Sequence, residues 1–329
     1  MKRMKRCLLV FLVFLLLTGC SPSLELPMLT VPTETEEKGT TMEYADPRLD
    51  EEMNVILLGN SNCYYWTDEL YGMLAAEGYR NVNICNVYYS GCTFQKHWEW
   101  LRTDEAKYQF FICNERGRNV RNNVSLRTCL SYKNWDAVFL VATNSRQVYE
   151  GEEQEFEKGI RTYLPKVLEF LKERAPKADY FWQQIWAQGL GGRAKTVEDQ
   201  IKASAIFRRI SLGLSKDFQL TNVPQGDAWE AVRHNPLIRE GGLTLNMRIA
   251  QGRADYDDHI HDGDVGGGQY LNACVFYELL TQKSCLENSF RPRYTYQGTD
   301  MSLSEEKINL LKQTAHQAVV SASEKRSAE

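Results

Sequence analysis

The sequence predicts an α/β protein, a three-layer α/β/α sandwich with a central parallel sheet of about five strands. Short apolar runs that end in turn residues alternate along the chain with longer segments whose apolar residues recur at helical spacing. Strands joined by helical crossovers are the unit from which parallel sheets are built. About 280 residues, from residue 51 to the end, suit one α/β domain with insertions.

The first predicted strand begins at Asn54, and its four-residue apolar run, Val55–Leu58, ends in Gly59-Asn60-Ser61. An uninterrupted apolar run of this length is typical of a strand buried on both faces. The segment Thr67–Glu77 follows with the apolar spacing of a helix. Ser61 is therefore expected at the carboxyl edge of the sheet, where open α/β sheets bind ligands. Asn and Ser are also common turn residues, so this turn alone does not establish catalysis.

The same two patterns predict the other elements of the chain. The further core strands are expected at residues 82–89, 135–145, 178–186 and 218–223. The further helices are expected at residues 152–173, 198–214, 226–233, 270–281 and 304–321. Between them, Tyr108–Cys113 and the segment after Gly117 resemble the two arms of an inserted hairpin, which leads into a short apolar piece at residues 126–130.

The N-terminus has the pattern of a secretory signal. Four basic residues precede the apolar run Cys7–Leu17, which is too short to be a persuasive membrane span. Leu17-Thr-Gly-Cys20 then resembles a bacterial lipobox, which implies a signal peptide over residues 1–19 and a lipid on Cys20. The alternative is an uncleaved signal anchor.

Residues 20–50 are predicted to be a tether, because prolines and a Thr/Glu run favour an extended segment. Without the four basic residues, the formal net charge of −4 becomes about −8, so nucleic acid is not an expected partner. We expect a monomer that is lipid-anchored on the extracytoplasmic side of a bacterial membrane and touches the membrane through the lipid only. The main domain is expected at residues 51–290, with a C-terminal extension at 291–329 that packs on it.

Seven of the nine cysteines remain after the signal and the lipidated Cys20 are set aside. An odd number means at least one free thiol, and a core of this size does not need disulfides. No Cys-x-x-Cys pair occurs, which argues against a structural zinc site. Cys63 and Cys92 each lie close behind a candidate site residue, so we consider a disulfide between them.

A second motif, Asp258-His259-Ile260-His261, lies near the C-terminus and precedes the predicted helix at 270–281. Together with the Gly59-Asn60-Ser61 turn, this Asp-x-x-His resembles the SGNH (GDSL-like) hydrolase superfamily, whose fold is flavodoxin-like. The resemblance is closest to a branch with Gly-Asn-Ser in its first block. Three further motifs of that branch recur in order, as Trp135-Asp136, Gln183–Ala187 and Gly226–Trp229.

The resemblance implies a catalytic triad of Ser61, His261 and Asp258. Ser61 would be the nucleophile, His261 the base, and Asp258 the group that orients the imidazole. His259 competes with His261, but only His261 completes the Asp-x-x-His spacing. The expected oxyanion donors are the backbone N–H groups of Ser61 and Gly91 and the side chain of Asn144, where Ala142-Thr-Asn144-Ser145 departs from the family's Gly-x-Asn-Asp.

Four more residues are expected to line the substrate cleft, namely Asn60, His97, Gln184 and Trp186. Asp227 is predicted to be an N-cap and not a catalytic acid. No cofactor is expected, since the glycine-rich loop at 189–192 lacks the Lys-Ser/Thr of a phosphate-binding loop.

These features predict an SGNH-type serine esterase or deacylase. Its expected substrate is an O-acetyl or similar acyl group on extracellular or cell-envelope carbohydrate, or another small ester. Two alternatives stay open, an inactive glycan-binding lipoprotein on the same fold and an O-acyltransferase. The acidic residues around His259 and His261 also permit a metal site, which the resemblance makes the lesser alternative; no metal is expected.

Overall fold

A computed structural model describes residues 51–141, 145–188, 193–238, 267–296, 299–300 and 302–328. These residues belong to one compact unit, Ala45–Glu329. Within them, no helix has the length and apolar character needed to cross a membrane.

The described residues form a seven-stranded sheet in the order β4-β3-β2-β1-β5-β6-β7. Its strands are β1 Glu52–Gly59, β2 Asn81–Tyr88, β3 Tyr108–Asn114, β4 Gly117–Val124, β5 Ala137–Val141, β6 Asp179–Gln183 and β7 Thr221–Val223. The five strands β2, β1, β5, β6 and β7 are parallel, which confirms the predicted core. Taken alone they have the flavodoxin-like order 2-1-3-4-5.

The predicted hairpin insertion is also confirmed. Strands β3 and β4 pair with each other, and β3 pairs with β2, in both cases antiparallel. The hairpin therefore widens the parallel core into a mixed sheet, and β4 is its outer strand at this end.

The helices follow the predicted positions, with three additions. They are α1 Thr67–Glu77, α2 Phe94–Thr103, α3 Leu126–Leu130, α4 Arg146–Tyr149, α5 Glu153–Arg174, α6 Val197–Phe218, α7 Gln225–Val232, α8 Gly268–Thr281 and α9 Glu305–Ala328. Helices α2 and α4 were not predicted, and α3 forms where only a short apolar piece was expected. Two 3-10 turns, η2 Ser61–Cys63 and η5 Cys285–Glu287, and a small ladder of β8 Thr295–Tyr296 with β9 Thr299–Asp300 complete the described elements.

Two predicted strands are shorter in the structure. The strand expected at 218–223 begins only at Thr221, because α6 continues to Phe218 and ends in a left-handed cap at Gln219. The strand expected at 178–186 ends at Gln183. Beyond it, Gln184 donates its backbone N–H to Val223, and Gly226 donates to Gln184, so the chain here is bound to β7 and to the start of α7.

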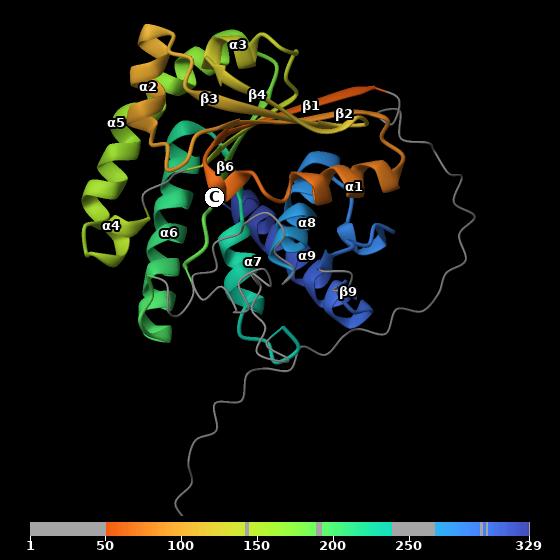
Figure 1. The fold of residues 1–329 in the computed structure, drawn as a ribbon. Coiled ribbons are helices and arrows are strands. Elements are labelled where there is room, and N and C mark those ends of the chain that lie inside the picture. Colours follow the sequence, from red (N-terminus) through yellow and green to blue (C-terminus); the bar gives the residue numbers. More distant parts are fainter. Residues whose placement is uncertain are drawn as a thin grey trace, which may run out of the picture. The chain divides into compact units, whose positions relative to one another are not determined.

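The helices cover both faces of the sheet, as Figure 1 shows, with α1 and α8 on one side and α2, α5 and α6 on the other. On the first face, Phe276 of α8 packs on Phe139 of β5 with ring centroids 4.6 Å apart. On the second, Trp182 of β6 stacks on Phe94 of α2 at 5.7 Å and donates to Ser211 of α6. The alternate side chains of the strands thus build two apolar layers.

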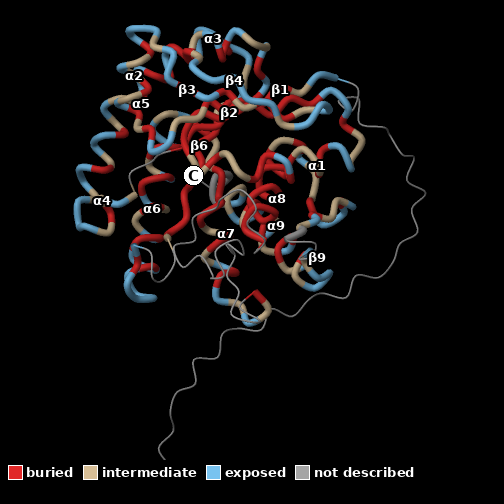
Figure 2. The backbone as a smooth tube through the Cα atoms, in the orientation of Figure 1, coloured by how far each residue is buried: buried red, intermediate tan, exposed pale blue. Residues whose placement is uncertain are grey.

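Helix α8 lies inside the molecule, as the red tube in Figure 2 shows. It packs between the sheet, α1 and α9, and Trp66 of the chain entering α1 lies 4.0 Å from Phe276 between ring centroids. Helix α9 buries Ile308, Leu311 and Ala315 against this layer.

Candidate functional site

Ser61 lies where the strand order of the parallel core reverses. β2 pairs with one edge of β1 and β5 with the other, and Ser61 begins the turn at the carboxyl end of β1. This switch point is the usual ligand position in a doubly wound sheet. Gly59 keeps the strands close here, because a Cβ atom on it would lie 2.2 Å from Cγ1 of Val141.

The turn around Ser61 is held by its own hydrogen bonds. The Asn62 N–H donates to Oδ1 of Asn60 at 3.0 Å, and the Cys63 N–H donates to the carbonyl of Asn60 at 3.1 Å. Within the described part of the chain, neither the Ser61 hydroxyl nor its backbone N–H has a hydrogen-bond partner. Ser61 is half-buried, so its hydroxyl and its backbone N–H lie side by side near the surface.

Amides from two other strands reach this turn, and sequence reasoning did not assign them this role. Asn86 of β2 donates to the Cys63 carbonyl at 2.7 Å. Gln183 of β6 donates to the Asn62 carbonyl at 2.7 Å. Both side chains are 1% exposed. In the sequence, Gln183 stands out only as part of the Gln183–Ala187 motif, and no local pattern marks Asn86.

Gly91 lies in the turn between β2 and α2, at the same edge of the sheet as Ser61. The Tyr89 N–H donates to the Gly59 carbonyl at 3.4 Å, which ties this turn to the end of β1. Gly91 is exposed and has φ +62°, a left-handed conformation that favours glycine. A Cβ atom there would meet nothing within 4 Å, so the constraint is the backbone angle and not close packing.

The other predicted catalytic residues, Asn144, Asp258 and His261, lie outside the described residues, as does Cys20, the predicted lipidation site. His259 and the acidic cluster around it also lie outside. Among the residues that the structure does describe, no group of three or more His, Cys, Asp and Glu side chains could hold a metal ion.

His97 is a packing residue of α2 and not the cleft residue that was expected. Its side chain is 1% exposed, and its Nδ1 lies 2.8 Å from the Tyr108 hydroxyl and 3.5 Å from Sγ of Cys92. Burial lowers the pKa of His97 to about 3, so the ring is neutral and enclosed.

Asn60, Gln184 and Trp186, also expected in the cleft, are buried as well, at 1%, 0% and 5% exposure. Trp186 stacks on Trp229 with ring centroids 4.6 Å apart. Gln184 donates to Oδ1 of Asp227 at 2.7 Å. In the structure these three side chains support the edge of the sheet from within.

Asp227 is not the N-cap of α7, which corrects the prediction. Pro224 takes that position, and Asp227 lies in the first turn of the helix. Its carboxylate accepts from Gln184 and, at 3.1 Å, from Arg208 of α6. The residue therefore joins α7 to α6 and to the segment just after β6.

The disulfide considered between Cys63 and Cys92 is absent, because all seven cysteines of the described residues are free and buried. Sγ of Cys63 lies against the Asn60 carbonyl at 3.2 Å, whereas Sγ of Cys92 faces His97. Burial raises the pKa of the Cys63 thiol to about 12, so it stays protonated and unreactive.

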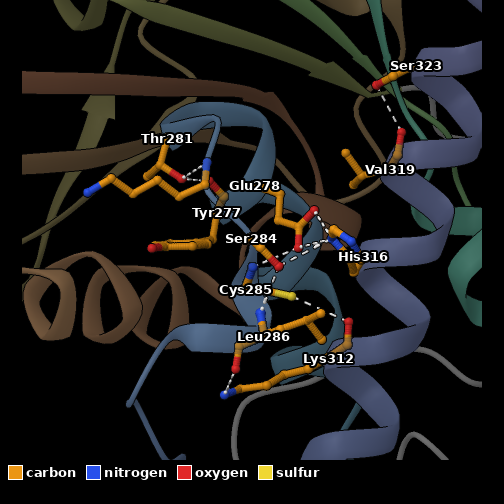
Figure 3. Close-up of polar contacts among 11 residues, drawn as sticks. Tyr277, Glu278, Thr281, Ser284, Cys285, Leu286, Lys312, His316, Val319 and Ser323 are labelled. Carbon is orange, nitrogen blue, oxygen red and sulfur yellow. Dashed lines mark hydrogen bonds and ion pairs between the residues drawn. The ribbon is translucent and has the colours of Figure 1, made fainter. Parts of the chain in front are cut away.

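A second grouping of Ser, His and Glu lies between α8 and α9, shown in Figure 3. Both carboxylate oxygens of Glu278 lie about 3 Å from Nδ1 of His316, and the Ser284 hydroxyl lies 3.4 Å from that same nitrogen. A catalytic triad uses the two ring nitrogens separately. Ser284 also caps η5 by accepting from the Leu286 N–H, so this grouping is structural.

A sequence profile of the family described as "Domain of unknown function (DUF4886)" matches residues 54–318. The fold is similar to the crystal structure of a DUF4886 family protein from Bacteroides uniformis, with 19% identity over 82% of this chain and 95% of that chain and a TM-score of 0.66. A comparison with curated proteins gave no match.

Two further crystal structures are more distantly similar. A putative GDSL-like lipase from Parabacteroides merdae has 16% identity over 71% of this chain and 97% of that chain, with a TM-score of 0.43. A putative acylhydrolase from Bacteroides fragilis has 11% identity over 72% of this chain and 90% of that chain, with a TM-score of 0.39.

Proposed function

This chain belongs to the DUF4886 family, and we propose that it is a serine esterase or deacylase of the SGNH type. The observation that carries the proposal is the position of Ser61. It begins a fixed turn at the switch point of a flavodoxin-like sheet, and its hydroxyl and N–H have no partner among the described residues.

The proposed reaction is acyl transfer to water. The Ser61 hydroxyl attacks the ester carbonyl while His261 takes its proton, and the tetrahedral oxyanion accepts hydrogen bonds from the N–H groups of Ser61 and Gly91 and from Asn144. His261 then protonates the leaving alcohol, and water releases the acyl group by the same steps in reverse. Asp258 orients the imidazole and stabilises its charged form.

The proposed substrate is an O-acetyl or similar small acyl ester on extracellular or cell-envelope carbohydrate. Two sequence features support this choice, the signal and lipobox pattern that ends at Cys20 and the net negative charge, which does not suit nucleic acid. We propose that the protein is anchored by this lipid on the extracytoplasmic side.

Hydrolysis of a chromogenic acetyl ester by the full chain, beside Ser61→Ala and His261→Ala variants, tests the function. We expect turnover by the parent and a loss of at least about a thousandfold in kcat for both variants, because triad residues act as a unit. A serine-directed fluorophosphonate should label the parent and not Ser61→Ala.

Activity that survives both substitutions would refute the assignment of Ser61 and His261. A folded parent that neither turns over the ester nor takes the label would favour the glycan-binding alternative. Acyl transfer to an added sugar alcohol in preference to water would favour the O-acyltransferase.

A further inference from the structure

We propose that Asn86 and Gln183 are positioning residues, an amide clamp that fixes the direction of the Ser61 N–H and hydroxyl from both sides of β1. The inference rests on the proposed function for its catalytic consequence. Its structural part, the rigidity of the turn, stands independently of that function.

On one side, Asn86 lies three-quarters of the way along β2, the strand paired with β1. Its Nδ2 donates to the Cys63 carbonyl at 2.7 Å and contacts Sγ of Cys63 at 3.2 Å. Both residues are 1% exposed, so water does not compete for this carbonyl.

On the other side, Gln183 reaches across the end of β5. Gln183 is in register with Val141, the last residue of β5, and its Nε2 donates to the Asn62 carbonyl at 2.7 Å. The indole N–H of Trp66 donates to the same carbonyl at 3.4 Å.

Together with the turn's own bonds, the clamp fixes each peptide plane around Ser61. The Asn60 carbonyl accepts from the Cys63 N–H, and the Asn62 N–H donates to Oδ1 of Asn60. The Asn62 and Cys63 carbonyls accept from Gln183 and Asn86. An oxyanion donor that is held before reaction needs no reorganisation in the transition state.

The clamp has a cost that packing alone does not explain. Oδ1 of Asn86 and Oε1 of Gln183 are buried without a hydrogen-bond partner in the described structure. A buried unsatisfied polar atom destabilises a fold by about 1–3 kcal/mol; an apolar side chain at either position would remove that atom, but it would also take away an amide donor from a turn carbonyl. Residues that reduce stability yet orient a reactive turn fit a role in function.

The test uses two apolar variants and a matched control in the full chain. Gln183→Met and Asn86→Leu replace the donors by apolar side chains of similar length. Asn83→Leu removes another buried amide of β2, 8% exposed, that donates to Asn54 and not to the turn. Gln183→His serves as the conservative variant, because its Nε2–H lies about as far from the backbone as the amide nitrogen of glutamine.

We expect Gln183→Met and Asn86→Leu each to lower kcat for the chromogenic ester ~10- to 100-fold with KM changed less than about threefold, since a small misplacement of reacting groups costs that much. Melting temperature should change little, because each variant removes one unsatisfied oxygen and gives up one hydrogen bond to the turn. Gln183→His should recover part of kcat, and Asn83→Leu should keep kcat within about threefold.

Hydrogen exchange at the Asn62 and Cys63 amides provides a readout that needs no activity. We expect it to be at least about tenfold faster in the two clamp variants than in the parent and in Asn83→Leu. Unchanged exchange would overturn the clamp. If the parent has no esterase activity but exchange is faster in its two clamp variants, the clamp stands and only the proposed function is refuted. Unchanged kcat in an active enzyme whose two clamp variants are folded would overturn the catalytic role.

Discussion

The Arg118 guanidinium lies 2.9 Å from the Asp68 carboxylate, and this contact joins the inserted hairpin to the chain that follows the candidate nucleophile. Arg118 comes from β4, and Asp68 from the first turn of α1. The same guanidinium lies 4.8 Å from the ring centre of Tyr64 and donates to the Thr67 hydroxyl at 3.3 Å. The hairpin therefore supports the segment directly after the η2 turn.

We expect Arg118→Met to destabilise the fold by about 1–2 kcal/mol, because a largely buried guanidinium with charged and aromatic partners is lost. Its side chain is 17% exposed, in contrast to 83% for Arg116 in the adjoining turn. Arg116→Met should change the free energy of unfolding by less than about 0.5 kcal/mol. Urea denaturation measures both, and equal effects would show that the Arg118 contacts do not hold the hairpin.

Glu69 should make the fold less stable as the pH rises. It is 8% exposed, it accepts from the Tyr294 hydroxyl at 3.3 Å, and Asp68 and Arg118 are the nearest charges. Burial raises the pKa of Glu69 from 4.5 to about 7. The folded state therefore binds the Glu69 proton more tightly than the unfolded state does. The stabilisation by this proton is complete below pH 4.5 and is lost as the pH rises to about 7.

Glu69→Gln should remove this dependence. We expect the variant to match the parent near pH 4 and to exceed its free energy of unfolding by up to about 3 kcal/mol at pH 8, the equivalent of the pKa shift. Urea titrations at both pH values measure it. If the free energy of unfolding depends on pH equally in the two proteins, ionisation of Glu69 does not destabilise the fold.

The order of the core strands could be predicted because each strand has a local signal. The apolar run at 55–58 and the helical spacing of apolar residues at 153–174 can each be recognised from neighbouring residues alone. Helix α2 was missed because His97 faces the same buried side as Phe94 and Leu101, and a histidine interrupts an apolar pattern. The buried His97 ring is paired with the Tyr108 hydroxyl of β3, and no local sequence pattern records this contact.

Some residues of the candidate site could likewise be predicted from local sequence, and others could not. Ser61 was found from the chemistry of its turn and Gly91 from the family resemblance, and both signals are local in the sequence. Asn86 and Gln183 were not, since Gln183 meets Asn62 across 121 residues of sequence. A contact of that separation is set by strand order, so only the assembled sheet brings the amide and the turn together.

His97 gives an opposite pH effect, confined to acid. Burial lowers its pKa from 6.5 to about 3, so the unfolded state binds a proton that the folded state excludes. The stability is complete above pH 6.5 and falls as the pH drops to about 3. Between pH 7 and pH 4, the free energy of unfolding should fall by about 3 kcal/mol less in His97→Phe than in the parent. The variant also loses the hydrogen bond to Tyr108. An unchanged acid slope would mean that another group carries the effect.

The seven described cysteines should behave as inert thiols. All seven are buried, and no disulfide joins any two of them. Burial raises the thiol pKa of Cys63, Cys85, Cys92, Cys113 and Cys129. We expect alkylation of the native protein by iodoacetamide at pH 7.5 to be at least about a hundredfold slower than after unfolding, because the thiolate is the reactive form. Mass spectrometry then counts the modified sites. A thiol that reacts quickly in the native protein would identify a cysteine that is exposed or whose pKa is low.

Gly59→Ala tests how closely β1 and β5 must approach at the switch point. The added Cβ would lie 2.2 Å from Cγ1 of Val141 and 3.0 Å from Sγ of Cys63, both in the core, so the strand ends must separate. We expect a loss of about 1–3 kcal/mol in the free energy of unfolding and a fall in esterase turnover, because overpacking moves the turn that carries Ser61. Gly159→Ala is the control. Its Cβ would meet nothing within 4 Å on α5, and the substitution should raise stability by about 0.5–1 kcal/mol. Equal stability changes in the two variants would show that the glycine at the end of β1 is not required by packing.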